Sequence, residues 1–211
     1  MSEESRLLSR RERLNELFFE YRNCRACTLS EYRSVPIRGG SCPTAPVVVV
    51  VDRPPYNPSR TDGLRLGIIQ VIFREATTNA DDIWLSCVVM CPTGKGLGGE
   101  AAASPHRKAC QQRLLREIDI VQPEVIVTLG AGPTQCLVRK DAKTKKEAIV
   151  DIEPAPGRIC QALIPGAETV YRVPLIASYS IGQVESKGHH IAKHVKEAVL
   201  LAKSIRRRKC R

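Results

Sequence analysis

Cysteines stand out among the residues of this chain that could do chemistry: there are nine in 211 residues. Two residues separate Cys24 from Cys27, and eighteen separate Cys91 from Cys110. A Cys-x2-Cys pair can hold two corners of one metal centre, and two further thiolates would complete a four-cysteine set. Zinc and a 4Fe–4S cluster both accept four thiolates, so the spacing leaves both open. The alternative interpretation is a chance pair beside ordinary buried cysteines.

Histidines and a glycine-rich segment are the next candidates. His190 and His194 are four residues apart and share a helix face, as a metal pair would, but no acidic ligand is near. We therefore interpret His189, His190 and His194 as surface residues or contacts to DNA phosphates. Residues 94–99 match G-x-G-x-x-G, yet the acidic residue that dinucleotide binding requires is absent from the next predicted strand.

Charge and composition indicate a polyanionic partner. Lys and Arg number 33 against 22 Asp and Glu, a net charge of +11, which favours nucleic acid and leaves a solvated basic surface as the alternative. Phosphate contacts are predicted for Lys95, Arg107 and Lys108. No apolar run approaches the about 20 residues of a membrane span, and the N-terminus lacks a signal-peptide core. We expect a cytoplasmic, nucleoid-associated monomer without disulfides.

The elements that must position these residues alternate between strands and helices. Residues 47–51 are an unbroken valine run, typical of a strand buried on both faces. Further strands are predicted at 82–90, 124–129, 148–153, 158–164 and 170–178, and helices at 5–23, 63–76, 104–121, 133–138 and from 184 onward. This alternation predicts one α/β domain over residues 1–211, a three-layer α/β/α architecture around a central, mainly parallel sheet.

The order of these motifs resembles a known superfamily. The Cys-x2-Cys pair, the valine-rich strand, Val88-Val89-Met90-Cys91, Cys110, and the strand Pro123-Glu124-Val125-Ile126-Val127-Thr128-Leu129-Gly130 follow one another as in the iron–sulfur uracil-DNA glycosylases of families 4 and 5. The resemblance runs from about residue 20 to 185. It implies that Cys24, Cys27, Cys91 and Cys110 ligate a structural 4Fe–4S cluster that staples the N-terminal helix onto the sheet, with zinc as the alternative.

The resemblance also assigns roles near the first strand. Where the family has Gly-Glu-x-Pro-Gly, this chain has Val51-Asp52-Arg53-Pro54-Pro55. Asp52 would orient water and stabilise the sugar cation, although a strand-end Asp can equally cap a turn. Arg53 and Tyr56 are the nearby candidates for contact with the base. Both glycines of the family motif are replaced.

Three other family features differ. An Asn that reads the pyrimidine edge corresponds to Cys87, a weak donor, and a stacking Phe is missing from 57–70. The family's His-Pro-Ser loop corresponds to Ser178-Tyr179-Ser180, so Ser180 replaces the catalytic histidine and Tyr179 becomes a base contact. A histidine of the last helix could substitute for it.

These departures favour a DNA glycosylase that acts on a uracil-like or modified pyrimidine, including a bulkier one, rather than on ordinary uracil. Its substrate base would be flipped out of the DNA stack before hydrolysis of the N-glycosidic bond. The alternative is a catalytically inactive, glycosylase-like accessory protein that binds DNA. A zinc-stapled DNA-binding protein outside this superfamily is a third hypothesis. All three have DNA as partner and no membrane. The surplus cysteines at 42, 87, 136 and 160 would be buried, and Cys210 is left over.

Overall fold

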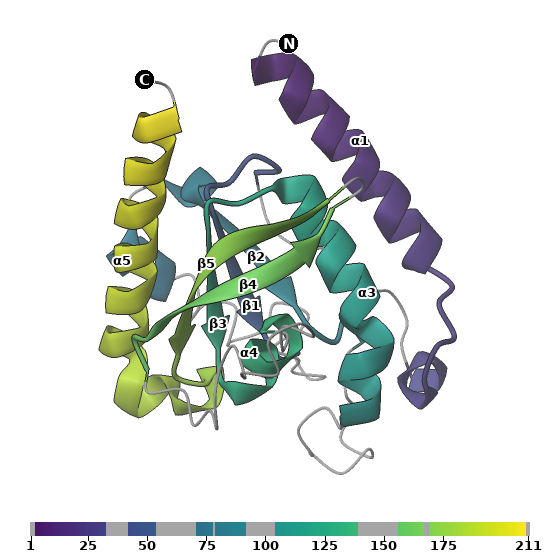
Figure 1. Cartoon of the computed structure of the whole chain (residues 1–211). Helices are drawn as coiled ribbons and strands as arrows, with labels where there is room; N and C mark the ends of the chain where they lie inside the picture. Colours follow the sequence, from purple (N-terminus) through teal and green to yellow (C-terminus); the bar gives the residue numbers. More distant parts are fainter. Residues whose placement is uncertain are drawn as a thin grey trace.

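The computed structural model shows a sheet between helices (Figure 1). It describes residues 3–32, 42–53, 71–77, 79–91, 104–138, 156–166 and 169–209. The predicted strand at 148–153, the first part of the predicted helix at 63–76 and the glycine-rich segment 92–103 lie outside these ranges.

Within the described residues, the sheet has five strands in the order β2-β1-β3-β5-β4. They are β1 (Val47–Val51), β2 (Ile83–Cys87), β3 (Val125–Leu129), β4 (Ile159–Pro165) and β5 (Val170–Ser178). Strands β1, β2, β3 and β5 are parallel, and β4 is antiparallel to β5. The prediction of an α/β fold with a mainly parallel sheet is therefore confirmed.

Helices cover both faces of this sheet. They are α1 (Glu3–Tyr21), α3 (Ser104–Val121), α4 (Ala131–Leu137) and α5 (Val184–Lys209), with short 3-10 turns η1 (Thr28–Tyr32), η2 (Ala80–Asp82) and η3 (Ile181–Gln183). Residues 71–76 are also helical. α5 packs against β1, β3 and β5, whereas α1 packs on α3 (Figure 1). None of the described helices has both the length and the apolar character needed to cross a bilayer.

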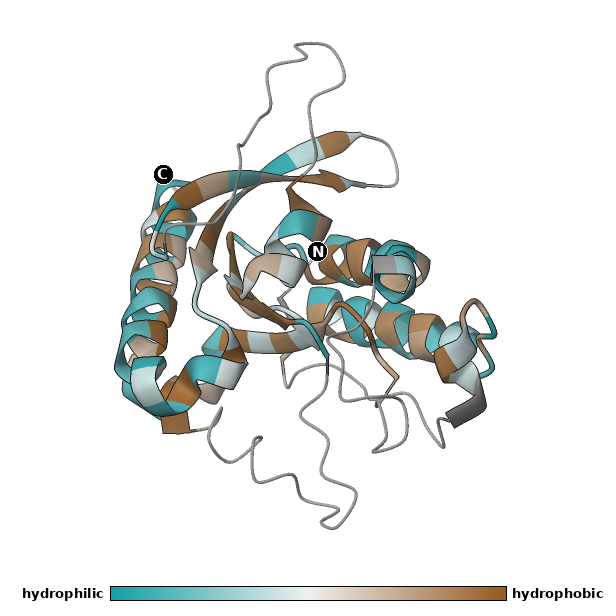
Figure 2. Cartoon of the chain, turned by 90° about the horizontal axis from the view of Figure 1, so that it is seen from below, coloured by the Kyte–Doolittle hydropathy of each residue, from teal (hydrophilic) through white to brown (hydrophobic). Residues whose placement is uncertain are grey.

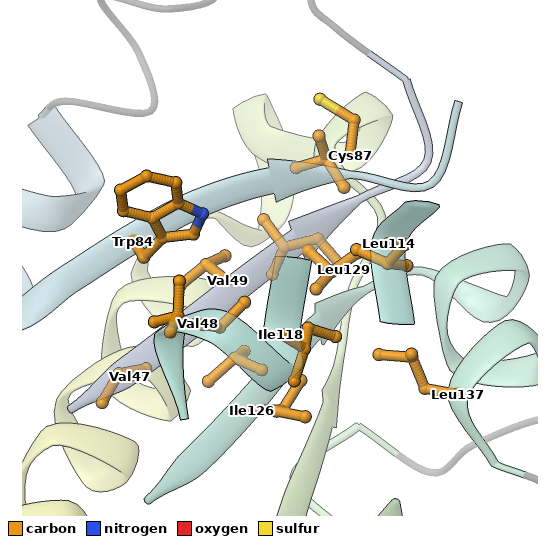
Figure 3. Packing of buried hydrophobic residues seen from close by; sticks show 14 of the residues in the cluster. Val47, Val48, Val49, Trp84, Cys87, Leu114, Ile118, Ile126, Leu129 and Leu137 are labelled. Atoms are coloured by element: carbon orange, nitrogen blue, oxygen red, sulfur yellow. The ribbon is translucent and has the colours of Figure 1, made fainter. Parts of the chain in front are cut away.

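The core lies along the central strands. All five valines of β1 and all residues of β3 are buried, because helices cover both faces there. β-Branched side chains suit this pleated environment. Figure 3 shows Val47, Val48 and Val49 packed among Ile126 and the other aliphatic side chains.

Apolar stripes fix the outer helices. Ile191, Val195 and Ala198 of α5 are fully buried at helical spacing, as predicted. Figure 2 shows apolar segments alternating with hydrophilic ones along this helix. Strand β2 ends three residues earlier than predicted. Beyond it, Val88 and Val89 still donate backbone hydrogen bonds to the carbonyls of Val51 and Asp52, both at 2.9 Å.

Candidate active site

The candidate site lies where the parallel strands end. The strand register pairs Val51 with both Cys87 and Leu129, and pairs Leu129 with Ser178. Four carboxyl ends therefore lie side by side at one edge of the sheet, the carboxyl edge. Open α/β sheets bind their ligands at this edge.

Asp52 directly follows β1 and forms a bidentate ion pair with Arg107 of α3. Arg107 donates Nε to Oδ1 at 2.7 Å and Nη2 to Oδ2 at 3.0 Å. The two side chains are 21% and 22% exposed, and the hydrogen bond to Asp52 raises the pKa of Arg107. Two parallel charge-assisted bonds fix both the position and the plane of a carboxylate. The predicted catalytic carboxylate is thus ordered by a residue that the sequence had suggested for phosphate.

Helix α4 closes the carboxyl edge beside this ion pair. A Cβ at Gly132 would lie 2.8 Å from both Cζ and Nε of Arg107, so the glycine leaves the space that the guanidinium occupies. One turn further on, the carbonyl of Cys136 accepts a hydrogen bond from Gln111 Nε2 at 2.6 Å. Burial raises the pKa of the Cys136 thiol to about 11, so this thiol is neutral at neutral pH.

Cys87 ends β2 and is held from behind by a buried network. Its carbonyl accepts a hydrogen bond from Arg113, which also pairs with Glu117, and both of these side chains are almost fully buried. Glu117 accepts further bonds from Trp84 Nε1 at 2.8 Å and Ser86 Oγ at 2.7 Å. Burial raises the pKa of the Cys87 thiol to about 12, so it is a neutral group at this edge (Figure 3).

The end of β5 contacts His194 of α5, which is buried, so its interpretation as a surface residue or phosphate contact is wrong. His194 of α5 is 7% exposed, and its Nδ1 lies 2.8 Å from Ser178 Oγ. The Tyr179 ring stacks on His194 with centroids 6.1 Å apart and planes inclined by 16°. Burial lowers the pKa of His194, so a neutral imidazole supports this end of the strand.

The loop after β5 is fixed by helix capping. Ser180 Oγ accepts from the Gly182 amide at 3.3 Å, and the Ser180 amide donates to Gln183 Oε1 at 3.2 Å, which makes a capping box at η3. Gly130 has a φ of 108°, and a Cβ there would lie 3.3 Å from Ser180 Cβ. Ser180, the predicted catalytic serine, therefore lies close to Gly130 at the end of β3.

The remaining predicted contacts are spread around this edge. Arg53 is half-buried directly after Asp52, and Lys108 is exposed near the start of α3. The rings of His189 and His190 lie 3.9 Å apart, and His190 lies 5.6 Å from Tyr179. Tyr56 and Lys95 lie outside the described residues.

The four predicted metal ligands come from three segments. Cys24 and Cys27 are half-buried between α1 and η1, Cys91 is buried after β2, and Cys110 is half-buried on α3. Burial raises the pKa of the Cys110 thiol. A backbone hydrogen bond from Met90 lowers this pKa, whereas the charges of Cys27 and Cys24 raise it.

The part of the chain that the structure describes does not form a metal centre. Among the described residues, no three His, Cys, Asp or Glu side chains are arranged to hold a metal ion, so the predicted staple is not shown. The residue types nevertheless fit a thiolate-bound group, because a Cys-x2-Cys pair and two further cysteines supply four thiols. A contact of 3.3 Å between Thr28 Oγ1 and His106 Nε2 also holds η1 against α3, the helix that carries Cys110.

The surplus cysteines largely follow the prediction of burial. Cys87, Cys136 and Cys160 are buried, whereas Cys42 is half-buried. Its Sγ lies 3.2 Å from Thr44 Oγ1. Cys210 lies outside the described residues.

Sequence reasoning missed two features of the site: the Asp52–Arg107 pair and the Ser178–His194 contact. Helix spacing held a signal for the first, because Arg107 lies three residues before Cys110 and four before Gln111, on a face turned toward the sheet. The apolar stripe of α5 held a signal for the second, since His194 immediately precedes buried Val195.

Comparisons with known proteins find curated relatives, among them two type-4 uracil-DNA glycosylases. No protein-family profile matches the chain. The chain is 26% identical over 132 residues to a type-4 uracil-DNA glycosylase of Sulfurisphaera tokodaii, covering 60% of this chain and 59% of that protein. It is 28% identical over 126 residues to a type-4 uracil-DNA glycosylase of Thermotoga maritima, covering 57% and 64% respectively. The chain therefore spans about three fifths of the length of these relatives.

Proposed function

From its similarity to type-4 uracil-DNA glycosylases, which confirms the predicted resemblance to the uracil-DNA glycosylase superfamily, we propose that this chain is a DNA glycosylase. It would hydrolyse the N-glycosidic bond of a modified pyrimidine that has been flipped out of DNA. The observation that carries the proposal is the carboxylate of Asp52, held in a fixed orientation at the carboxyl edge. The net charge of +11 supports DNA as the partner.

Asp52 supplies the anion that this reaction requires. Breaking the bond develops positive charge on the deoxyribose and negative charge on the departing base. A carboxylate offers about four lone-pair sites, of which Arg107 engages one on each oxygen. The others can accept hydrogen bonds from an attacking water. Arg107 would act as the positioning residue, since it fixes the plane in which that water is held.

The base would be received by the ends of β2 and β5. Tyr179 offers an aromatic wall, Ser180 offers a hydroxyl donor, and the neutral thiol of Cys87 is a weak donor. None of these can reproduce the paired contact of an amide with a pyrimidine edge. We therefore favour a bulkier or modified pyrimidine over uracil. Base flipping itself costs about a few kcal/mol.

Cys24, Cys27, Cys91 and Cys110 would hold a 4Fe–4S cluster, with zinc as the alternative. When bound, the group would supply structural cross-linking rather than catalysis. A group held by these four side chains would tie the end of α1 to α3 and to the chain after β2. Purified protein should be brown and absorb near about 400 nm if the group is iron–sulfur, whereas a colourless zinc protein would overturn that choice.

The experiment that tests the proposal is a panel of oligonucleotides. Single- and double-stranded DNA with uracil, hypoxanthine or bulky modified pyrimidines is incubated with the protein, and alkali cleavage reports abasic sites. We expect base release from at least one modified pyrimidine and its loss in Asp52→Asn. Asp81→Asn is the matched control, because Asp81 is exposed near η2, outside the site. Full release by Asp52→Asn would show that Asp52 is not the catalytic anion.

A second candidate function is DNA binding without chemistry. The ion pair with Arg107 favours it, because a guanidinium offsets the charge that Asp52 would present to the sugar. This candidate predicts salt-sensitive DNA binding with no base release from any member of the panel. The monomeric state and the cytoplasmic, nucleoid-associated location stay predictions from the sequence.

A further inference from the structure

A second polar site lies at the opposite edge of the sheet, where the parallel strands begin. Thr44 precedes β1 and Glu124 precedes β3, and both line a cavity of about 550 Å³ between α1 and α5. Figure 1 shows the start of α1 and the end of α5 at the same end of the molecule. We define the amino-edge pocket by its lining residues Arg6, Arg10, Thr44, Gln122, Glu124, Arg206 and Lys209.

Cations dominate this pocket. Four of its lining residues are Arg or Lys, and Glu124 is the single carboxylate among the lining residues that the structure describes. Arg206 donates Nε to Glu124 at 2.9 Å, and Lys209 Nζ lies 3.9 Å from the same side chain. Burial lowers the pKa of Arg10, and the charges of Arg206 and Arg6 lower it further. Because one carboxylate faces four cations, the pocket carries excess positive charge and its cations repel one another.

The arginines are held in place rather than free to move away. Arg10 donates Nη1 to the Val121 carbonyl at 2.8 Å and Nη2 to Gln122 Oε1 at 2.7 Å. Arg206 donates Nη2 to the Thr44 carbonyl at 2.7 Å. A guanidinium carries five N–H groups, so each arginine keeps donors for a ligand.

The side chain of Gln122 helps to form the pocket, because it holds Arg10 in place. Gln122 directly follows α3 with a φ of 48°, in the left-handed region where glycine is the usual residue. A residue with a side chain is strained in this backbone conformation. The glutamine side chain accepts the hydrogen bond from Arg10, a role that glycine could not fill.

We propose that the amino-edge pocket binds a small anion with clustered phosphate groups. Fixed guanidinium groups bind phosphate through paired hydrogen bonds, and its volume suits a small ligand. No aromatic or aliphatic side chain lines it among the described residues, so the ligand is recognised by its phosphates rather than by a stacked base. The inference is independent of the proposed glycosylase activity, because the pocket and the candidate active site lie at opposite edges of the sheet.

Calorimetric titration with tripolyphosphate at about 0.15 M salt tests this inference. The double variant Arg6→Gln/Lys209→Gln removes two exposed pocket cations, and we expect it to bind at least about tenfold more weakly than the wild type. Lys193→Gln/Lys196→Gln removes the same charge from α5 outside the pocket and should change affinity by less than about twofold. Thermal unfolding checks that both variants fold.

Three results would overturn the proposal. The wild type could fail to bind tripolyphosphate, or the control variant could lose as much affinity as the pocket variant, which would indicate general charge attraction. Displacement of tripolyphosphate by an unmodified DNA duplex would assign the pocket to the nucleic-acid backbone instead. Base release in the oligonucleotide panel is scored separately, so failure of either proposal leaves the other standing.

Discussion

Gly132→Ala should separate the Asp52–Arg107 pair without unfolding the protein. The added Cβ would lie 2.8 Å from the guanidinium carbon, whereas ordinary contacts begin at 3.4 Å. The end of the Arg107 side chain must therefore move by about 0.6 Å, given those two distances, and a displacement near 1 Å can cost about 100-fold in rate. We expect base release to fall by between about tenfold and about 100-fold.

The same substitution should change the free energy of unfolding by no more than about 1 kcal/mol. A partly exposed ion pair contributes about 0–1 kcal/mol, and alanine in a helix offsets a similar amount. Thermal unfolding measures this, and the nitrogen-15 NMR signal of Arg107 Nε–H reports the ion pair directly. Gly188→Ala is the control, because its Cβ would lie 3.8 Å from Val184 Cγ2. An unchanged Arg107 signal, or full activity with that signal shifted, would refute the reasoning.

Three further predictions concern buried groups at or behind the carboxyl edge. Arg113→Met should lower the free energy of unfolding by about 3–5 kcal/mol because the charge of Glu117 stays buried without its cation. Arg113→Met/Glu117→Met removes that charge but leaves Trp84 Nε1 and Ser86 Oγ without their acceptor, so it should recover only part of the loss; urea unfolding of both variants tests this. The pKa of His194 in the folded protein lies below its unfolded value of 6.5, so the stability it contributes is full above about pH 6.5 and is lost as the pH falls from there toward the lower folded pKa. His194→Gln should flatten this part of the measured stability–pH curve. Iodoacetamide should leave Cys87 unmodified at neutral pH until the protein unfolds, as mass spectrometry would detect, because its thiol pKa is about 12.

The fold was largely predictable because its elements are encoded locally. The valine run of β1 and the sequence of β5 match their predicted ranges, and α3 runs from Ser104 to Val121 as its Ser-Pro start indicates. Element ends were less predictable where pairing continues past a strand, as at Val88 and Val89. The antiparallel direction of β4 depends on its contacts with β5, and local sequence does not specify it.

The contacts within the site were harder to predict than its location. That Asp52 and Cys87 share an edge follows from parallel strands, because the carboxyl ends of such strands meet. Which cation faces Asp52 depends on the rotation of α3 over a sequence separation of 55 residues. The contact between Ser178 and His194 likewise depends on how α5 lies across the sheet. The four-cysteine centre stays a prediction, because the described residues do not form a metal site.

Charge composition predicted the kind of partner but did not locate its surface. The net charge of +11 is a property of the whole chain, whereas the structure places Arg107 against a carboxylate at one edge and gathers Arg6, Arg10, Arg206 and Lys209 at the other. Because Asp52 offsets the charge of Arg107, this arginine adds little net positive charge to the attraction of DNA. The unbalanced positive charge of the described pocket therefore lies opposite the proposed active site, and a count of lysines and arginines cannot identify which edge faces DNA.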